Sequence, residues 1–195
     1  MIAQRDFNFL SPESYLDLEQ QATVKHEYID GEIYAMAGAS ATHIQIVGNL
    51  YAALRSHLRG TGCDILFSDI KVRIDAKNCF YYPDLIVTCD DRDHENDHYR
   101  RFPKLIIEVL SDSTEARDRG DKFEDYSTLD SLQEYVLIAQ KKMRVECFRR
   151  TDRNRWTLQV YGPGDRVQFN SLDWTDAITT IYEAITFADP NTPAT

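Results

Sequence analysis

The sequence lacks several features that identify common classes of protein. No apolar run comes near the roughly 18 residues of a membrane-spanning helix, and no apolar stretch follows a basic region near the N-terminus. We therefore expect neither a membrane anchor nor a secretory signal. The four cysteines stand far apart without a CxxC pair, which favours reduced thiols in a cytoplasmic protein over a zinc site or a disulfide framework. A glycine-rich phosphate loop, a GxSxG motif and a cysteine–histidine pairing are also missing.

Positive charge is scarce as well. The 22 lysines and arginines face 32 acidic residues, a net charge of −10. This balance argues against a protein that coats nucleic acid by charge alone, but not against one that binds it through a local patch and a metal. With 43% hydrophobic residues, the chain has enough apolar material for a core. We expect one domain over residues 1–195, with a core at about 42–139, C-terminal hairpins and a helix at about 140–187, and a frayed tail at 188–195.

Apolar periodicity and turn residues predict a mixed α/β order of elements. A short helix begins at Ser11, and Asp30-Gly31 predicts the turn of a hairpin. The last helix carries Ile178 and Ile185 in one apolar stripe. Between these ends we expect a helix at 42–59, extended segments at 66–74, 80–88 and 104–110, a helix at 114–128, a strand at 134–139 and then hairpins through Phe169.

Two carboxylates interrupt apolar strands and carry the strongest chemical signal. Glu108 falls inside a run that otherwise fits a fully buried strand, and Asp84 stands just ahead of Leu85 one strand earlier. A buried, unpaired carboxylate costs several kcal/mol, so each needs a cation, a metal or a proton. Alone, each fits an ion pair or a turn. Side chains of adjacent antiparallel strands can meet on one face, where two carboxylates favour a hard divalent cation, Mg²⁺ or Mn²⁺.

The order of these motifs resembles a known family. Tyr82-Pro83-Asp84, followed by Leu105-Ile106-Ile107-Glu108-Val109-Leu110-Ser111, is similar to the core of PD-(D/E)xK nucleases, and more narrowly to the Uma-two (Uma2) family of restriction endonucleases. The resemblance covers about residues 10–187. It implies an α/β, restriction-endonuclease-like core of helix, three-strand meander, helix and strand, with an N-terminal helix and hairpin and C-terminal β-hairpins. It also implies a homodimer that hydrolyses duplex DNA with Mg²⁺.

One position departs from the superfamily pattern, which places a lysine two residues after the glutamate. Leu110 occupies that position here. In the narrower family the lysine lies on the following helix, where Lys122 fits, with Asp118 and Tyr126 at i−4 and i+4 on the same helix face. A surface lysine paired with Asp118 is the structural alternative. Lys71 is a second candidate for the catalytic lysine.

The resemblance supplies the remaining roles of the site. Glu27 matches a hairpin glutamate of the family and is the expected third acid. Lys122 would orient the attacking water, while the metal would lower the pKa of that water and stabilise charge on the phosphate. The expected metal ligands are Asp84, Glu108 and the carbonyl of Val109, with Glu27 acting directly or through water and His43 at the edge of the cleft.

Two charged segments lie outside this site. Residues 141–155 contain seven basic and two acidic residues and could grip phosphates, although a solvated hairpin or half of a dimer contact fits equally well. Residues 90–98 are acidic but fail the EF-hand spacing, so we expect a solvated loop. The candidate nucleic-acid contacts are Lys71, Lys142, Arg144 and Arg149.

Two other functions remain open at this stage. One is a catalytically weak or inactive nuclease-fold protein that acts as a nucleic-acid-binding or regulatory module, which Leu110 and the negative net charge favour. The other is a dimeric scaffold in which the acidic loop and the basic hairpin pair with each other.

Overall fold

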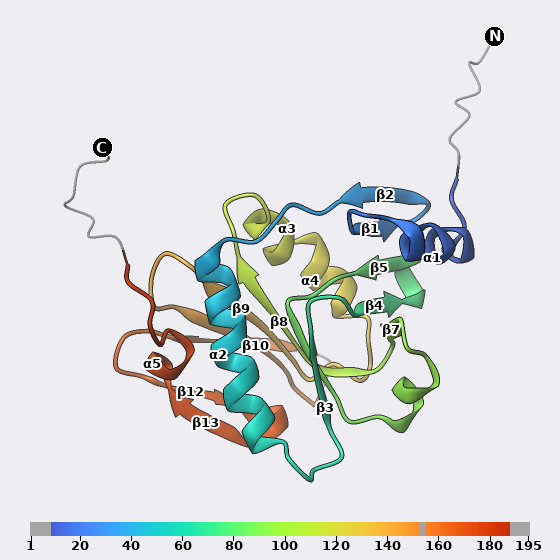
Figure 1. Ribbon diagram of the computed structural model, residues 1–195. Coiled ribbons are helices and arrows are strands. Elements are labelled where there is room, and N and C mark those ends of the chain that lie inside the picture. The colour runs from blue at the N-terminus through green and yellow to red at the C-terminus, as the bar shows by residue number, and fades with distance from the viewer. Residues whose placement is uncertain (1–8, 153–154, 188–195) are drawn as a thin grey trace, which may run out of the picture.

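A computed structural model describes residues 9–152 and 155–187, so the expected frayed tail at 188–195 lies outside the described residues. Its largest element is a six-stranded sheet, shown with the rest of the chain in Figure 1. The neighbouring strands β8 and β9 run parallel, and the other neighbours in this sheet are antiparallel. In spatial order the strands are β11 (Trp156–Tyr161), β10 (Val145–Arg150), β9 (Glu134–Ala139), β8 (Pro103–Leu110), β6 (Leu85–Thr88) and β3 (Asp64–Phe67).

Smaller sheets flank the large one. The N-terminal helix α1 (Pro12–Gln21), which Ser11 caps, lies beside a five-stranded sheet, and Tyr15 of α1 packs against Tyr28 and Phe80 of that sheet. Two strands near the C-terminus, β12 (Arg166–Phe169) and β13 (Trp174–Ala177), form a hairpin. The five-stranded sheet has the order β2 (Glu32–Ala35), β1 (His26–Ile29), β5 (Cys79–Tyr81), β4 (Lys71–Ile74) and β7 (Tyr99–Arg100).

Helices cover both faces of the six-stranded sheet. Helix α2 (Ala41–His57) lies in front of it in Figure 1, together with the short α5 (Ile178–Ile181). The buried face of α2 packs with Leu105, Ile107 and Val109 of β8, whereas Ile106 and Leu110 pack with Tyr126 on the opposite face. Because β8 is buried on both faces, its sequence is apolar almost without interruption. Among the described helices, none combines the length and the apolar character needed to cross a bilayer.

Two of the three extended segments predicted from the sequence are wrong as single strands. Residues 66–74 divide into β3 and β4, and residues 80–88 divide into β5 and β6, so that each segment crosses from one sheet to the other. The first break lies at Ser68, which has a left-handed φ of 68°. The second lies at Pro83, which has no N–H to donate to a neighbouring strand. Neither the alternation at 69–74 nor the apolar runs at 80–82 and 85–87 show that the chain changes sheet at these points.

The two later helices are also shorter than predicted. The expected helix at 114–128 consists of α3 (Glu115–Arg119) and α4 (Asp121–Tyr126), separated at Gly120. A Cβ atom at this glycine would lie 3.2 Å from the carbonyl oxygen of Ala116, so the tight turn favours a residue without a side chain. The last helix ends at Ile181, and Ile185 lies beyond it.

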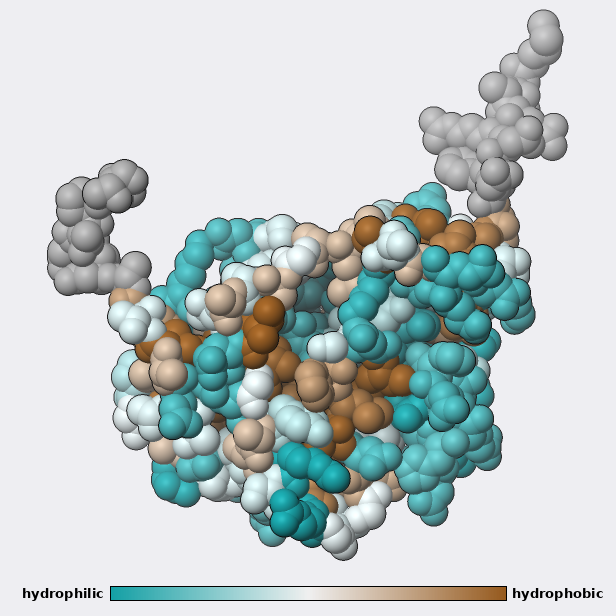
Figure 2. Space-filling model, in the orientation of Figure 1, coloured by the Kyte–Doolittle hydropathy of each residue, from teal (hydrophilic) through white to brown (hydrophobic). Residues whose placement is uncertain are grey.

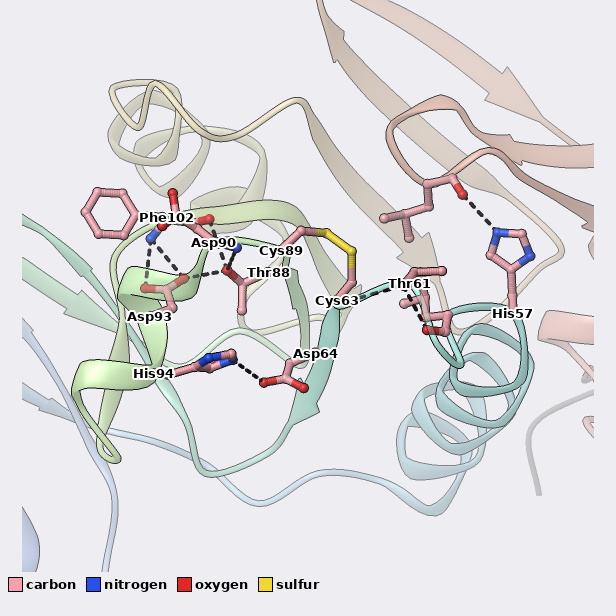
Figure 3. Close-up of a disulfide and its surroundings, with 12 residues drawn as sticks. His57, Thr61, Cys63, Asp64, Thr88, Cys89, Asp90, Asp93, His94 and Phe102 are labelled. Carbon is pink, nitrogen blue, oxygen red and sulfur yellow. Dashed lines mark hydrogen bonds and ion pairs between the residues drawn. A yellow bond between two sulfur atoms is a disulfide. The ribbon is translucent and has the colours of Figure 1, made fainter.

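The expectation that all cysteines are reduced thiols is wrong for two of them. A disulfide joins Cys63 to Cys89, while Cys79 and Cys147 are free and buried. Strands β3 and β6 are antiparallel, and the pairing of Asp64 with Thr88 brings the two flanking cysteines together (Figure 3). The sequence separation of 26 residues contains no CxxC signal, so only the strand register reveals this partnership.

The acidic segment 90–98 is more ordered than the predicted solvated loop. Residues Asp91–Glu95 form a turn of 3₁₀-helix, within which Asp93 is buried. Its carboxylate accepts hydrogen bonds from the Thr88 hydroxyl and from the backbone N–H of Arg101 and Phe102, as Figure 3 shows in part. One acid of this segment therefore fastens the loop to the start of β8.

Candidate active site

Asp84 and Glu108 meet where β6 and β8 run side by side. Leu85 pairs with Ile107, which places the two acids next to each other at the same end of the strand pair. The backbone N–H of Asp84 donates to Glu108 Oε2 over 3.4 Å, and the N–H of Val109 donates to Asp84 Oδ2 over 2.7 Å. The structure thus brings together the two acids that the sequence analysis paired.

Lys122 of α4 contacts three acids with one ammonium group. Its Nζ lies 2.9 Å from Glu27 Oε1, 3.2 Å from Glu108 Oε1 and 3.5 Å from Asp118 Oδ1. The turn at Gly120 lies between Asp118 and Lys122 and leaves both side chains directed at the same buried space. With Leu110 in the superfamily's lysine position, the cation next to Glu108 comes from the following helix.

Glu27 reaches the same cluster from β1. It is 4% exposed, and its Oε2 lies 2.7 Å from Nη1 of Arg117 in α3. Its Oε1 accepts a hydrogen bond over 3.4 Å from the backbone N–H of Tyr82, just before the Pro83-Asp84 step. Glu27, Asp84 and Glu108 therefore converge from three separate strands, and Lys122 lies between two of them.

Negative charge is in excess in this cluster, which comprises Glu27, Asp84, Glu108, Asp118, Arg117 and Lys122. Four carboxylates face two cations, which leaves two negative charges. Burial raises the pKa of Glu108 well above its ordinary value, and Lys122 offsets only part of that effect while the other acids add to it. Burial opposes the charge on Lys122, but the carboxylates outweigh it and raise the pKa, so the ammonium stays charged at neutral pH.

Comparisons with known proteins identify a family for this chain. The profile of the Uma2 family, described as "Putative restriction endonuclease", matches residues 12–179. This chain belongs to the Uma2 family.

Two relatives and one solved structure are also similar to this chain. The uncharacterized protein slr1290 of Synechocystis sp. (strain ATCC 27184 / PCC 6803 / Kazusa) is 39% identical over 181 residues, which cover 93% of this chain and 95% of slr1290. A second uncharacterized protein of that strain, sll1609, is 35% identical over 166 residues and covers 84% of this chain and 94% of its own length. The crystal structure of a "putative nuclease belonging to DUF820" from Anabaena variabilis has a TM-score of 0.69 at 16% identity, covering 82% of this chain and 90% of that one. That likeness shows a shared fold.

The donor chemistry of the candidate site fits a divalent cation. Carboxylate and carbonyl oxygens are the ligands that Mg²⁺ and Mn²⁺ prefer, and a dication would balance the two excess negative charges. Among the described residues, Asp118 Oδ1 is buried and accepts no hydrogen bond, with Lys122 Nζ 3.5 Å away as an ion-pair contact. Within residues 9–152 and 155–187, however, no three Asp, Glu, His or Cys side chains surround one point as ligands. The residues fit a metal by charge and by oxygen type, with the ammonium of Lys122 now lying between Glu27 and Glu108.

The sequence did not predict Arg117 and Gln140 as residues of the candidate site, and it placed His43 only at the edge of the cleft. His43, at the start of α2, lies with Nε2 2.8 Å from Asp84 Oδ1. Gln140, directly after β9, donates to the Leu110 carbonyl over 2.8 Å and lies 3.5 Å from His43 Nδ1. Arg117 and Gln140 had no signal beyond their place beside Asp118 and at the end of a buried strand. Both hold site residues in position.

The other predicted contacts have different surroundings. Lys71 is buried and donates to the Tyr82 hydroxyl over 3.1 Å, and burial lowers its pKa. Arg144 Nε lies 2.6 Å from Glu146 Oε1, and Arg149 Nε lies 2.8 Å from Glu134 Oε1. Both guanidinium groups thus bind carboxylates of the protein itself, whereas Lys142 is exposed at the β9–β10 turn.

Proposed function

We propose that this protein is a metal-dependent endonuclease that hydrolyses phosphodiester bonds in DNA. The observation that carries the proposal is the convergence of Asp84, Glu108 and Glu27 with the buried Lys122. Membership of the Uma2 family and the fold shared with a protein described as a "putative nuclease" support it. The proposed ligands of Mg²⁺ or Mn²⁺ are Asp84, Glu108 and the carbonyl oxygen of Val109.

The chain's own residues contribute position and charge. A bound divalent cation would supply a more acidic water and a counter-charge for the phosphate. Lys122 remains protonated, so it acts as a fixed positive charge that orients the attacking water and favours its deprotonated form, not as a proton acceptor. Arg117 holds Glu27, and the N–H of Val109 holds Asp84, which keeps the two carboxylates directed toward the site.

DNA cleavage tests the proposal directly. Supercoiled and linear DNA would be incubated with Mg²⁺ or Mn²⁺ and the wild type, Asp84→Ala, Glu108→Ala or Lys122→Ala. The matched control is Asp112→Ala, because Asp112 is an exposed carboxylate whose ion pair with Lys141 lies on the surface. We expect cleavage by the wild type and the control only. Cleavage that survives in all three site variants would come from a contaminant and would overturn the assigned site.

Metal binding gives an independent readout. Calorimetric titration with Mn²⁺ is expected to show uptake by the wild type and by Asp112→Ala, and loss of uptake in Asp84→Ala. No uptake by the wild type would remove the basis for pairing Asp84 with Glu108.

A second candidate function is a nucleic-acid-binding or regulatory module without turnover. It is favoured because contacts within the protein already occupy both carboxylate oxygens of Asp84. Oδ1 lies against His43, and Oδ2 accepts from the Val109 N–H. Binding of DNA without cleavage in either metal would select it. The homodimer implied by the family resemblance is a separate proposal, and sedimentation of the purified chain measures it.

A further inference from the structure

An apolar surface lies on the α2 face of the six-stranded sheet, near the end where β6 begins. Phe67, at the end of β3, is 45% exposed, and Ile44, in the first turn of α2, is 61% exposed. The rings of Phe67 and the half-buried Tyr51 lie 4.6 Å apart between centroids. Figure 2 shows hydrophobic surface in the middle of the face formed by α2 and β3. We call Ile44, Tyr51 and Phe67 the apolar platform.

The backbone links the apolar platform to Asp84. Phe67 pairs with Leu85, and the N–H of Ser68 lies 3.4 Å from the carbonyl oxygen of Asp84. Ile44 directly follows His43, which contacts the Asp84 carboxylate. Each end of the platform is therefore one residue away from a group that touches Asp84.

A second exposed ring stands beside Glu27. Tyr34 of β2 is 43% exposed and pairs with Glu27 across the strands. The Arg117 guanidinium lies 5.6 Å from the centroid of the Tyr34 ring. One exposed ring thus stands next to Glu27, and another is close along the backbone to Asp84.

The two cations of the acidic cluster, by contrast, are paired with its acids. The ammonium of Lys122 is buried among acids, and Arg117 is paired with Glu27. A duplex stacks its bases inside, so along its length it presents no free base to an exposed aromatic ring. A strand with unpaired bases presents ring faces, and every base can stack on an aromatic side chain.

Resting on the proposed function, we propose that the substrate of this site is DNA with unpaired nucleotides next to the cleaved bond, and that an unpaired base stacks on Phe67. Single strands, flaps and frayed ends share this chemistry. The inference specifies the substrate class, while the acids and Lys122 specify the reaction. An apolar segment of a partner protein is the other possible occupant, and the test separates it from a base.

Binding of fluorescently labelled oligonucleotides, measured by anisotropy, tests the inference. Three probes of equal length would be compared in Ca²⁺, which takes oxygen ligands like Mg²⁺: a single strand, its perfectly paired duplex, and a strand whose central nucleotides are abasic. The variants are Phe67→Ala, Phe67→Trp and, as control, Leu158→Ala, an exposed apolar side chain on β11 at the opposite edge of the sheet.

The wild type and Leu158→Ala are expected to bind the single strand about ten-fold more tightly than the abasic strand or the duplex. Phe67→Ala should lose that preference and Phe67→Trp should keep it, with unchanged thermal midpoints. Equal binding of all three probes by the wild type, or an unchanged preference in Phe67→Ala, would overturn the stacking proposal and leave a protein partner as the occupant. Failure of the wild type to bind any probe would instead contradict the proposed function itself.

Discussion

Two buried glutamates of the six-stranded sheet, on strands that β9 separates, have opposite surroundings. Glu146 of β10 is 4% exposed and lies against two arginines, with 2.6 Å to Arg144 Nε and 2.5 Å to Arg119 Nη1. Glu108 of β8 is 3% exposed, and it shares one lysine with two other acids.

The pKa shifts follow this difference. Burial alone would raise both values, but the two arginines bring the pKa of Glu146 below its ordinary value, whereas the pKa of Glu108 is raised. Two arginines compensate the negative charge of Glu146 within the protein, whereas the charge of Glu108 is not fully compensated. An uncompensated buried carboxylate is typical of a site that binds something else. The comparison therefore separates a structural ion pair from a candidate site.

Lys122→Met should produce the largest change. Without the ammonium, four carboxylates face only Arg117, and breaking a buried pair on one side costs about 3–5 kcal/mol of unfolding free energy. Urea unfolding at pH 7 in EDTA measures the loss. Lys141→Met is the control, because Lys141 and Asp112 are both largely exposed and an exposed pair contributes little.

A double variant tests whether the stability lost in Lys122→Met comes from the missing charge or from a general packing defect. Glu27→Gln combined with Lys122→Met removes one negative and one positive charge, so it should recover part of the stability lost in Lys122→Met alone. Equal stability of the single and double variants would show that charge is not what Lys122 contributes.

Glu134→Ala tests a compensated carboxylate of the same sheet. Glu134 accepts hydrogen bonds from Arg149 Nε over 2.8 Å and from the N–H groups of Asn170 and Ser171 over 3.0 and 2.8 Å. Its loss removes these hydrogen bonds to a buried carboxylate, and we expect about 3 kcal/mol lower unfolding free energy. DNA cleavage per folded molecule should not change. Loss of cleavage in protein that circular dichroism shows to be folded would contradict the division between the two kinds of acid.

Glu108→Gln should have the opposite effect on stability. Glutamine keeps an oxygen for the Lys122 ammonium and the Tyr126 hydroxyl but removes one excess negative charge. We expect about 1 kcal/mol higher unfolding free energy at pH 8 in EDTA, since a neutral replacement of a buried charge is often neutral or stabilising, together with loss of cleavage. A matched Glu146→Gln variant should be destabilised, because its arginines lose their counter-charge. Destabilisation of both variants would remove the contrast.

The sequence predicted the pairing of Asp84 with Glu108 because both acids interrupt apolar strands whose order along the chain makes them neighbours. The antiparallel pairing of Leu85 with Ile107 confirms that adjacency. The role of Lys122 came from the family resemblance, since a lysine on a short helix has no signature of its own. Its catalytic role stays a prediction.

Other features depend on long-range register that a single sequence does not display. The Cys63–Cys89 disulfide follows from the pairing of Asp64 with Thr88, and Arg117 and Gln140 join the site only after α3 and β9 pack. The breaks at Ser68 and Gly120 are set by local backbone geometry, which periodicity does not detect. Short breaks between consecutive elements are thus the main source of error.

The pH dependence of stability should give the smallest of these effects. The unfolded glutamate ionises near pH 4.3, and its folded pKa is higher, so the folded state holds the proton longer and the unfolding free energy falls as pH rises from 5 to 8. Burial raises the pKa of Asp118 in the same direction. The raised pKa of Lys122 adds a stabilisation that is constant below about pH 10, and the lowered pKa of Glu146 adds one that is complete above about pH 4.5.

The decline between pH 5 and 8 therefore reports the acids around Lys122. Thermal unfolding in EDTA should show it in the wild type, and Glu108→Gln should flatten it by less than the 1 kcal/mol expected for that variant at pH 8. Added Mg²⁺ should also flatten it, because a ligand that binds the ionised folded state stabilises that state. A decline of equal slope in the wild type and in Glu108→Gln would assign the titration to other groups and would remove the basis for calling Glu108 uncompensated.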